Sequence, residues 1–147
     1  MTKRPALHVD HVELFVPDRY EAAKWYRRTL GLEILADYEA WASDPRGPLM
    51  ISSDGGATKL ALFEGRPSAP DGGFRRVAFR VDAGGFQESL RRLRSLEVPD
   101  SRGRPLTDAS VVDHAKAFSV YFSDPYGHEL ELTTYDYDAV RALGPLL

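Results

Sequence analysis

Hydrophobic and polar residues alternate near the start of the chain, in the stretch LHVDHVELFV. One face of the predicted strand is apolar and comprises Val12, Leu14 and Val16. The other face carries mixed chemistry and comprises His11, Glu13 and Phe15. A strand with this pattern buries one face under a helix and leaves the other face free to line a cavity or a binding surface.

Helical spacing replaces the alternation directly after this strand. Asp18 is the predicted N-cap of a helix over RYEAAKWYRRTL, and Gly31 ends that helix. Its apolar stripe comprises Ala22, Trp25, Tyr26 and Leu30. A short strand is then predicted over LEILADY, and a hairpin over LMISS and TKLALFE around the turn DGGA. The first half therefore has the order β, α, β, β, β.

The same order of patterns returns in the second half of the chain. Residues from Arg76 to Asp82 alternate as a strand, and FSVYFSD and HELELTT flank the turn DPYG as another hairpin. The helix between them has an apolar stripe of Phe86, Leu90, Leu93 and Leu96. The Gly- and Pro-rich stretch GRPSAPDGG between the halves is interpreted as a linker.

Two offsets relate the halves residue by residue. Adding about 65 pairs the first strands and helices, such as Val12 with Val77, and adding about 70 pairs the hairpins, such as Ser53-Asp54 with Ser123-Asp124. We therefore predict two related modules in a single domain. They cover about residues 7–64 and 74–134, with a linker at about 65–73 and a C-terminal tail at 135–147.

The tail extends beyond the repeat and has a pattern of its own. Asp136 or Asp138 is the expected cap of a short helix. That helix would place Val140 and Leu143 against the sheet or against a partner subunit.

Composition and charge narrow the classes of function. The net charge of -3 and the dispersed arginines offer no basic surface for nucleic acid. The absence of cysteine excludes disulfides, thiolate metal sites and a cysteine nucleophile. The N-terminal residues lack the apolar run of a signal peptide, and no stretch reaches the roughly 18 apolar residues of a membrane span. We therefore expect a soluble cytoplasmic protein that binds neither nucleic acid nor membrane.

The offsets also pair four positions on the strand faces that point away from the helices. His11 corresponds to Arg76, and Ala61 corresponds to Glu131. If the two modules associate about a pseudo-two-fold axis, these positions meet in one shared concavity.

The stretches HVELFV, TLGLEI, RRVAFRVD and YFSDPYGHELEL resemble the vicinal oxygen chelate superfamily of glyoxalases, extradiol dioxygenases, fosfomycin-resistance enzymes and bleomycin-binding proteins. The resemblance covers about residues 7–134, and its most specific part is the DPxGxxxEL ending. It implies an α+β fold of two βαβββ modules whose curved mixed sheets form a cup, often with a divalent metal. Relatives of this size often form homodimers, so a homodimer is expected.

The resemblance also implies metal-ligand slots at His11, Arg76, Glu131 and Ala61. Two histidines and one carboxylate would hold Fe(II) or Mn(II) and leave positions open for a substrate. The Arg76 guanidinium has no lone pair to offer, and Ala61 has no donor atom. His11 and Glu131 are therefore the expected ligands of a divalent Fe, Mn, Ni or Zn ion at an incomplete site.

Three roles are open for the arginine in the vacant slot. Arg76 could pair with Glu131 as a structural ion pair. Alternatively, it could clamp a substrate carboxylate or phosphate while His11 and Glu131 act as acid and base. In a third arrangement, a shifted metal would use His11, Glu131 and either Glu13 or His114.

Further candidates lie on the same strand faces. The candidate catalytic residues are Glu131, His114 and Tyr121. The candidate substrate-binding residues are Arg76, Glu13, Phe15 and Phe63, and the two phenylalanines would join Tyr121 as an aromatic wall. The structural alternatives are a solvent-facing loop position for His114 and core packing for the rings. His8 and His128 are interpreted as structural, and Glu129 is expected to be more solvated than Glu131 because it lies nearer the turn.

Two classes of function follow for a small-molecule substrate or ligand. The first, which we favour from the sequence, is a metal-dependent enzyme, namely a lyase, dioxygenase or thiol transferase acting on a small oxygen-rich molecule, because His11 and Glu131 are both retained. The second is a metal-free protein that binds an aromatic or drug-like molecule, as bleomycin-binding relatives do. The residues at the other two slots, Arg76 and Ala61, favour this second class.

Overall fold

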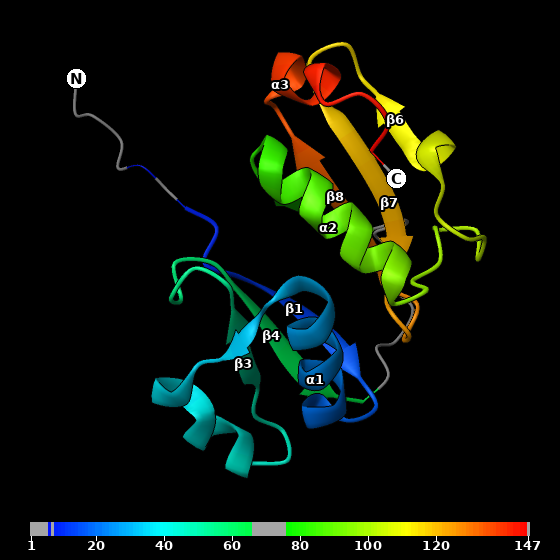
Figure 1. Ribbon diagram of the computed structural model, residues 1–147. Helices are drawn as coiled ribbons and strands as arrows, with labels where there is room; N and C mark the ends of the chain where they lie inside the picture. The colour runs from blue at the N-terminus through cyan, green and yellow to red at the C-terminus, as the bar shows by residue number, and fades with distance from the viewer. Residues whose placement is uncertain (1–5, 7, 66–75, 147) are drawn as a thin grey trace. The chain divides into compact units, whose positions relative to one another are not determined.

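The computed structural model describes residue 6 and residues 8–65 and 76–146 of the chain (Figure 1). The chain divides into two compact units, residues 1–69 and 70–147. Most of the predicted linker lies outside the described residues. Each unit has its own four-stranded mixed sheet and its own main helix, as the α+β prediction requires.

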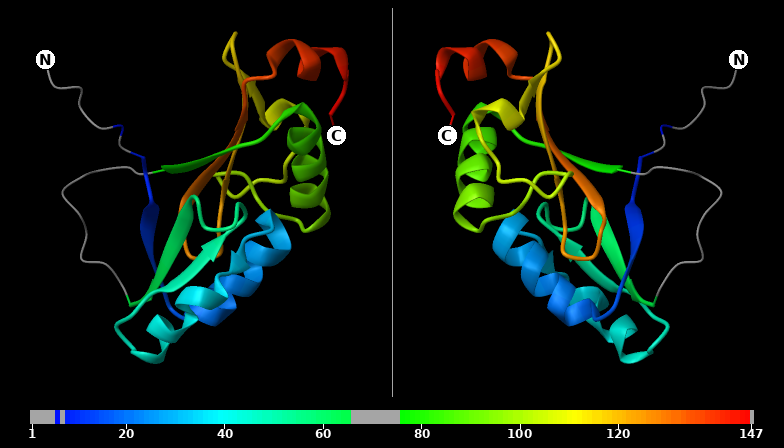
Figure 2. Two further views of the ribbon diagram at one scale, coloured as in Figure 1. Left: turned by 90° about the vertical axis from the view of Figure 1, so that its left-hand side faces the viewer. Right: turned by 90° about the vertical axis from the view of Figure 1, so that its right-hand side faces the viewer.

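The first unit is built around a sheet with the strand order β1-β4-β3-β2. The outer strand β1 runs parallel to β4, and the other neighbours are antiparallel. Helix α1 packs on one face of this sheet (Figure 2). The elements are β1 (His11–Val16), α1 (Arg19–Leu30), β2 (Glu33–Ile34), the 3-10 helix η1 (Ala36–Ser43), β3 (Leu49–Ser52) and β4 (Lys59–Glu64).

Helix α1 begins and ends as the sequence predicts. The Asp18 side chain accepts hydrogen bonds from the backbone N–H groups of Tyr20 and Glu21 at 2.9 and 3.0 Å. Gly31 ends the helix in the left-handed conformation, with φ 73°, which a residue without Cβ adopts at little cost. Tyr26 is fully buried against the sheet, whereas Trp25 is only half-buried.

The predicted strand over LEILADY is mostly wrong. Only Glu33–Ile34 is extended, and the chain then forms η1. The buried Arg19 side chain explains why a 3-10 helix forms in place of the strand, because its guanidinium donates hydrogen bonds to the carbonyls of Ala42, Asp44 and Gly47. These long-range contacts hold the segment in place of a strand ladder.

The second unit repeats this architecture with the strand order β5-β8-β7-β6. Strand β5 runs parallel to β8, and the other neighbours are antiparallel. Figure 2 shows α2 lying along one face of the sheet. The elements are β5 (Arg76–Arg80), α2 (Ala83–Ser95), the 3-10 helix η2 (Asp108–Ser110), β6 (Val111–Asp113), β7 (Phe118–Ser123), β8 (Glu129–Thr134) and α3 (Tyr137–Ala142).

The apolar stripe of α2 forms much of the core of this unit. Phe86, Leu90 and Leu93 are fully buried, as predicted. Leu96 is 37% exposed, contrary to the prediction, because the helix ends at Ser95 and Leu96 already belongs to its C-cap.

The tail forms the expected short helix, α3. Asp136 stands at its N-cap position, but the carboxylate accepts a hydrogen bond from the backbone N–H of Ala83 at 3.0 Å and so ties α3 to the start of α2. Val140 is buried, as predicted. Leu143 is 43% exposed, because the chain has left the helix by that residue.

The strand registers confirm the internal repeat and correct one detail of it. His11 lies opposite Lys59 in the first unit, and Arg76 lies opposite Glu129 in the second. On the hairpins, however, Ser52 rather than Ser53 is the counterpart of Ser123, because each of these two serines ends its strand. The turn residue Asp124 follows its strand directly, whereas Ser53 separates Asp54 from the end of its strand. The first hairpin therefore carries one extra residue before its turn.

The described helices lack the features of a membrane-spanning helix. Within residues 8–65 and 76–146, none of them combines the length and the apolar character that a membrane span requires.

Candidate functional site

The second unit presents a polar sheet face on the side away from α2. Cross-strand neighbours project from the same face of a sheet, so the register defines rows of side chains across it. One row contains Arg76, Glu129 and Ser123, and the next contains Ala78, Glu131 and Tyr121. We refer to this surface as the open face of the second sheet.

Arg76, Tyr121 and His114 form a connected group on this open face. The guanidinium carbon of Arg76 lies 4.3 Å from the centroid of the Tyr121 ring, within the range of a cation–π interaction. The Tyr121 hydroxyl and His114 Nε2 are 2.9 Å apart and share a hydrogen bond. The structure thus brings together three residues that the sequence predicts separately.

His114 reaches this group from the end of β6, a strand that the sequence analysis missed. Its backbone N–H donates to the carbonyl of Ala117 at 2.9 Å. Asp113 accepts a hydrogen bond from the backbone N–H of Ala115, whose φ of 67° turns the chain. The side chain of His114 is exposed, as the solvent-facing loop position predicts, and its role as an acid or base stays a prediction.

Glu131 lies in the middle of the open face and is half-buried. Its neighbours across the strands are Ala78 on one side and Tyr121 on the other. Arg76 is one row away, directly opposite Glu129. A pairing between Arg76 and Glu131 would therefore be diagonal, and it stays a prediction.

Glu129 is half-buried like Glu131, so the expectation that it is the more solvated of the two stays a prediction. Its Oε1 accepts a hydrogen bond of 3.3 Å from the hydroxyl of Ser123. Its Oε2 is buried and has no hydrogen-bond partner among the described residues.

The first unit has an open face of its own. Its rows contain His11 with Lys59, Glu13 with Ala61, and Phe15 with Phe63. The two phenylalanine rings are tilted against each other with centroids 5.8 Å apart, as expected for an aromatic pair. This contact joins β1 to β4, and an aromatic wall that also includes Tyr121 stays a prediction.

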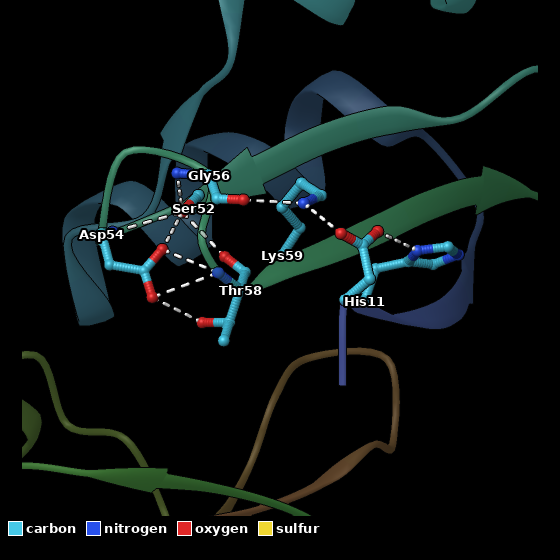
Figure 3. A network of polar contacts seen from close by, with 7 residues as sticks. His11, Ser52, Asp54, Gly56, Thr58 and Lys59 are labelled. Carbon is cyan, nitrogen blue, oxygen red and sulfur yellow. Dashed lines mark hydrogen bonds and ion pairs between the residues drawn. The ribbon is translucent and has the colours of Figure 1, made fainter. Parts of the chain in front are cut away.

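His11 is fixed by two residues that the sequence analysis did not single out (Figure 3). Its Nδ1 lies 2.8 Å from a carboxylate oxygen of Asp10, and Lys59 Nζ donates to the other oxygen at 2.8 Å. Lys59 holds the pKa of Asp10 below its ordinary value, and His11 lowers it further. Because a carboxylate only accepts, Nδ1 carries the proton, and Nε2 is left 3.7 Å from Glu13 Oε1.

Figure 3 also shows the polar turn between β3 and β4, which is built around Asp54. Its carboxylate accepts hydrogen bonds from the backbone N–H and the hydroxyl of Thr58 and from the hydroxyl of Ser52. The backbone hydrogen bond from Thr58 is the largest of the effects that lower the pKa of Asp54 to about 2. In the second unit, Asp124 accepts from the backbone N–H and from the ring of His128 in the same way, so His128 is part of a turn, as interpreted.

The donor atoms fit a metal only in part. Among the described residues, no group of three or more His, Asp or Glu side chains is arranged to hold a metal ion. His11 has an imidazole and Glu131 has a carboxylate, but the side chains of Arg76 and Ala61 offer no lone pair at the other two slots. The residues therefore do not match two histidines and a carboxylate. Because His11 and Glu131 belong to different units, a metal shared by them stays a prediction.

Comparison with known proteins gives a consistent result for most of the chain. The family described as Glyoxalase/Bleomycin resistance protein/Dioxygenase superfamily matches residues 8–132. A search of curated proteins finds no match.

Solved structures of similar fold have varied descriptions. An antibiotic-binding protein, TnmS3 from Streptomyces sp. CB03234, is 25% identical with a TM-score of 0.66, covering 90% of this chain and 99% of its own. Oxidase ChaP-H2 is 22% identical with a TM-score of 0.67, and coverage is 92% and 99%. The fosfomycin resistance protein FosX from Listeria monocytogenes is 17% identical with a TM-score of 0.64, again over 92% and 99%. The last two similarities establish the fold alone.

Proposed function

The chain belongs to the Glyoxalase/Bleomycin resistance protein/Dioxygenase superfamily, and we propose that within it the chain acts as a metal-independent binding protein for a small, planar, oxygen-bearing aromatic molecule. The site of binding is the open face of the second sheet. The observation that carries the proposal is the stacking of Arg76 on Tyr121, with 4.3 Å between the guanidinium carbon and the ring centroid.

A guanidinium stacked on a ring favours a planar ligand. Arg76 replaces a metal-binding imidazole with a flat, permanently charged group that stacks on aromatic faces and forms paired hydrogen bonds. One face of the guanidinium is directed to Tyr121, and a guanidinium can in general stack on a second ring or donate hydrogen bonds from its edge to oxygen atoms. Such contacts contribute about 0.5–2 kcal/mol each.

Tyr121 and His114 supply the polar end of the site. Their hydrogen bond of 2.9 Å orients the phenol, and each group can donate or accept. A ligand with hydroxyl or carbonyl oxygens would find directional partners beside the stacking surface. Ligand sites commonly combine an aromatic surface with a few polar groups of this kind.

The similarity to an antibiotic-binding protein supports a binding function. TnmS3 covers 90% of this chain at 25% identity, and its description names binding rather than catalysis. This support is weaker than the site chemistry, because members of one fold carry different functions.

A metal-dependent lyase, dioxygenase or thiol transferase is the second candidate. The geometry of His11 favours it, because a carboxylate that holds Nδ1 of a histidine prepares Nε2 for a metal. It ranks second because the side chains of Arg76 and Ala61 supply no donor atoms, so two of the four ligand slots are without a ligand.

Calorimetric titration of the untagged, chelator-treated protein tests the proposal. The probe is 2,6-dimethoxynaphthalene, which is planar and bears oxygen without ionising. Arg76→Gln should weaken binding by about tenfold, because it removes the stacked cation. Arg80→Gln is the matched control: Arg80 lies on the same strand and stacks on Tyr135 at 4.9 Å. It should leave the affinity unchanged.

Two results would overturn the proposal. One is the absence of measurable binding by the wild type at concentrations up to about 1 mM. The other is an equal loss of affinity in both arginine variants. Elemental analysis of the untreated protein tests the second candidate, since near-stoichiometric metal that disappears in Glu131→Gln would support the enzyme instead.

A further inference from the structure

We propose that Glu129 is a specificity-determining residue of the open face of the second sheet, and that its Oε2 accepts a hydrogen bond from a hydroxyl or amine group on the aromatic ligand. The inference rests on the proposed function and adds to it the chemical class of the ligand: a ring that bears a hydrogen-bond donor.

The two carboxylate oxygens of Glu129 have unequal surroundings. Oε1 accepts the hydroxyl of Ser123 at 3.3 Å. Oε2 is buried and lacks a hydrogen-bond partner within the described part of the chain. A buried carboxylate oxygen without a donor has lost its water without replacement, which is a free-energy cost. Native structures retain such groups rarely, and each requires an explanation.

The position of Glu129 connects this oxygen to the stacked group. Glu129 lies directly opposite Arg76 on β5 and directly opposite Ser123 on β7. Arg76 in turn stacks on Tyr121, which lies in the next row of the same face. The carboxylate is therefore adjacent to the guanidinium that we propose as the stacking surface for the ligand.

Rotation of the carboxylate can present Oε2 to a ligand. The Glu129 side chain as a whole is half-buried rather than buried. The terminal torsion of a glutamate has a broad energy profile, so the carboxylate can turn at little cost, and both oxygens then move together. An ionised carboxylate is acceptor-only, so it selects ligands that donate.

A pair of ligands separates this inference from the proposed function. The probes are 2,6-dihydroxynaphthalene, which donates hydrogen bonds, and 2,6-dimethoxynaphthalene, which has the same ring and oxygens but no donor. The wild type should bind the dihydroxy compound at least about tenfold more tightly, as expected for a hydrogen bond to a charged acceptor. Glu129→Gln should reduce this preference by about tenfold and leave binding of the dimethoxy compound unchanged.

Glu88→Gln is the control. Glu88 is exposed on α2, outside the open face, and undergoes the same change from acid to amide. It should retain the preference for the dihydroxy compound. Equal losses in both variants would overturn the assignment of Glu129, as would an unchanged preference in Glu129→Gln.

If the Glu129→Gln variant does not fold, titration of the wild type with the two compounds still tests the inference. Equal binding of the two compounds would overturn the inference and leave the proposed function standing; a water molecule that already satisfies Oε2 would give this result. If neither compound binds, the proposed function fails as well.

Discussion

His11 and Arg76 are structural counterparts. Each is the first residue of the first strand of its unit, and each lies opposite the first residue of the last strand, Lys59 for His11 and Glu129 for Arg76. The two pairs differ in which strand carries the permanently charged cation. In the first unit it is Lys59 on the last strand, whereas in the second unit it is Arg76 on the first strand. The two open faces are therefore related by backbone but not by charge.

This relationship predicts the result of restoring a histidine in the second unit. Arg76→His replaces a group without a lone pair by an imidazole, which is a metal ligand. We expect the variant to bind Ni(II) or Zn(II) at least about tenfold more tightly than the wild type in calorimetric titrations.

Arg80→His is the control for that experiment, because it adds a histidine to the same face of the same strand. If Arg80→His gains as much affinity as Arg76→His, the metal is binding to an added surface imidazole. The expectation for position 76 would then be wrong.

Asp54 predicts a component of acid stability. Hydrogen bonds, chiefly from Thr58, lower its pKa in the folded protein from 3.8 to about 2. Because the folded state favours the ionised form, the stabilisation is complete above the unfolded pKa and is lost as the pH falls from about 4 to 2. Asp54→Asn should therefore melt below the wild type at neutral pH, and the difference in Tm should narrow over that range.

A series of thermal melts between about pH 2 and 6 checks this expectation. Thr58→Val removes the hydroxyl donor and keeps the backbone donor, so it should give a smaller difference with the same pH dependence. A difference in Tm that stays constant with pH would show that the charge of Asp54 is not the cause.

Arg19 predicts a large loss of stability when its charge is removed. The side chain is buried, donates to the carbonyls of Ala42, Asp44 and Gly47, and lies 3.3 Å from a carboxylate oxygen of Glu64. Arg19→Met leaves these acceptors without a donor and should reduce the free energy of unfolding by about 2–4 kcal/mol. Urea denaturation measures the effect.

Arg27→Met is the matched control on the same helix. Arg27 is exposed and pairs with Glu33 at the surface, so its loss should change the free energy of unfolding by less than about 1 kcal/mol. Comparable losses in the two variants would contradict the role of Arg19 in holding η1.

Local signals in the sequence were sufficient for most of the fold. The cap at Asp18, the stop at Gly31 and the alternation in β1 each depend on neighbouring residues, and each was predicted correctly. Strand β6 was missed because three residues are too few to establish a period. Helix η1 was missed because its organising side chain, Arg19, contacts carbonyls that lie 23, 25 and 28 residues later in the chain.

The candidate site was predictable as a set of residues but not as a set of contacts. Alternation and the repeat offsets predicted that Arg76, Tyr121 and Glu131 share a face. The stacking of Arg76 on Tyr121 depends on side-chain orientation, and the contact of Lys59 with Asp10 spans 49 positions, so neither has a local signal. The buried oxygen of Glu129 likewise depends on both neighbouring strands.

The strand orders β1-β4-β3-β2 and β5-β8-β7-β6 have a consequence for synthesis on the ribosome. In each unit the last strand to be made lies between the first strand and the hairpin partner, so it joins two parts that are otherwise separate. Until that strand emerges, β1 or β5 has no neighbour with which to pair. Each half of the nascent chain must therefore wait for its final strand, β4 or β8, before its sheet can close, and a chain arrested before that point exposes unpaired strand edges.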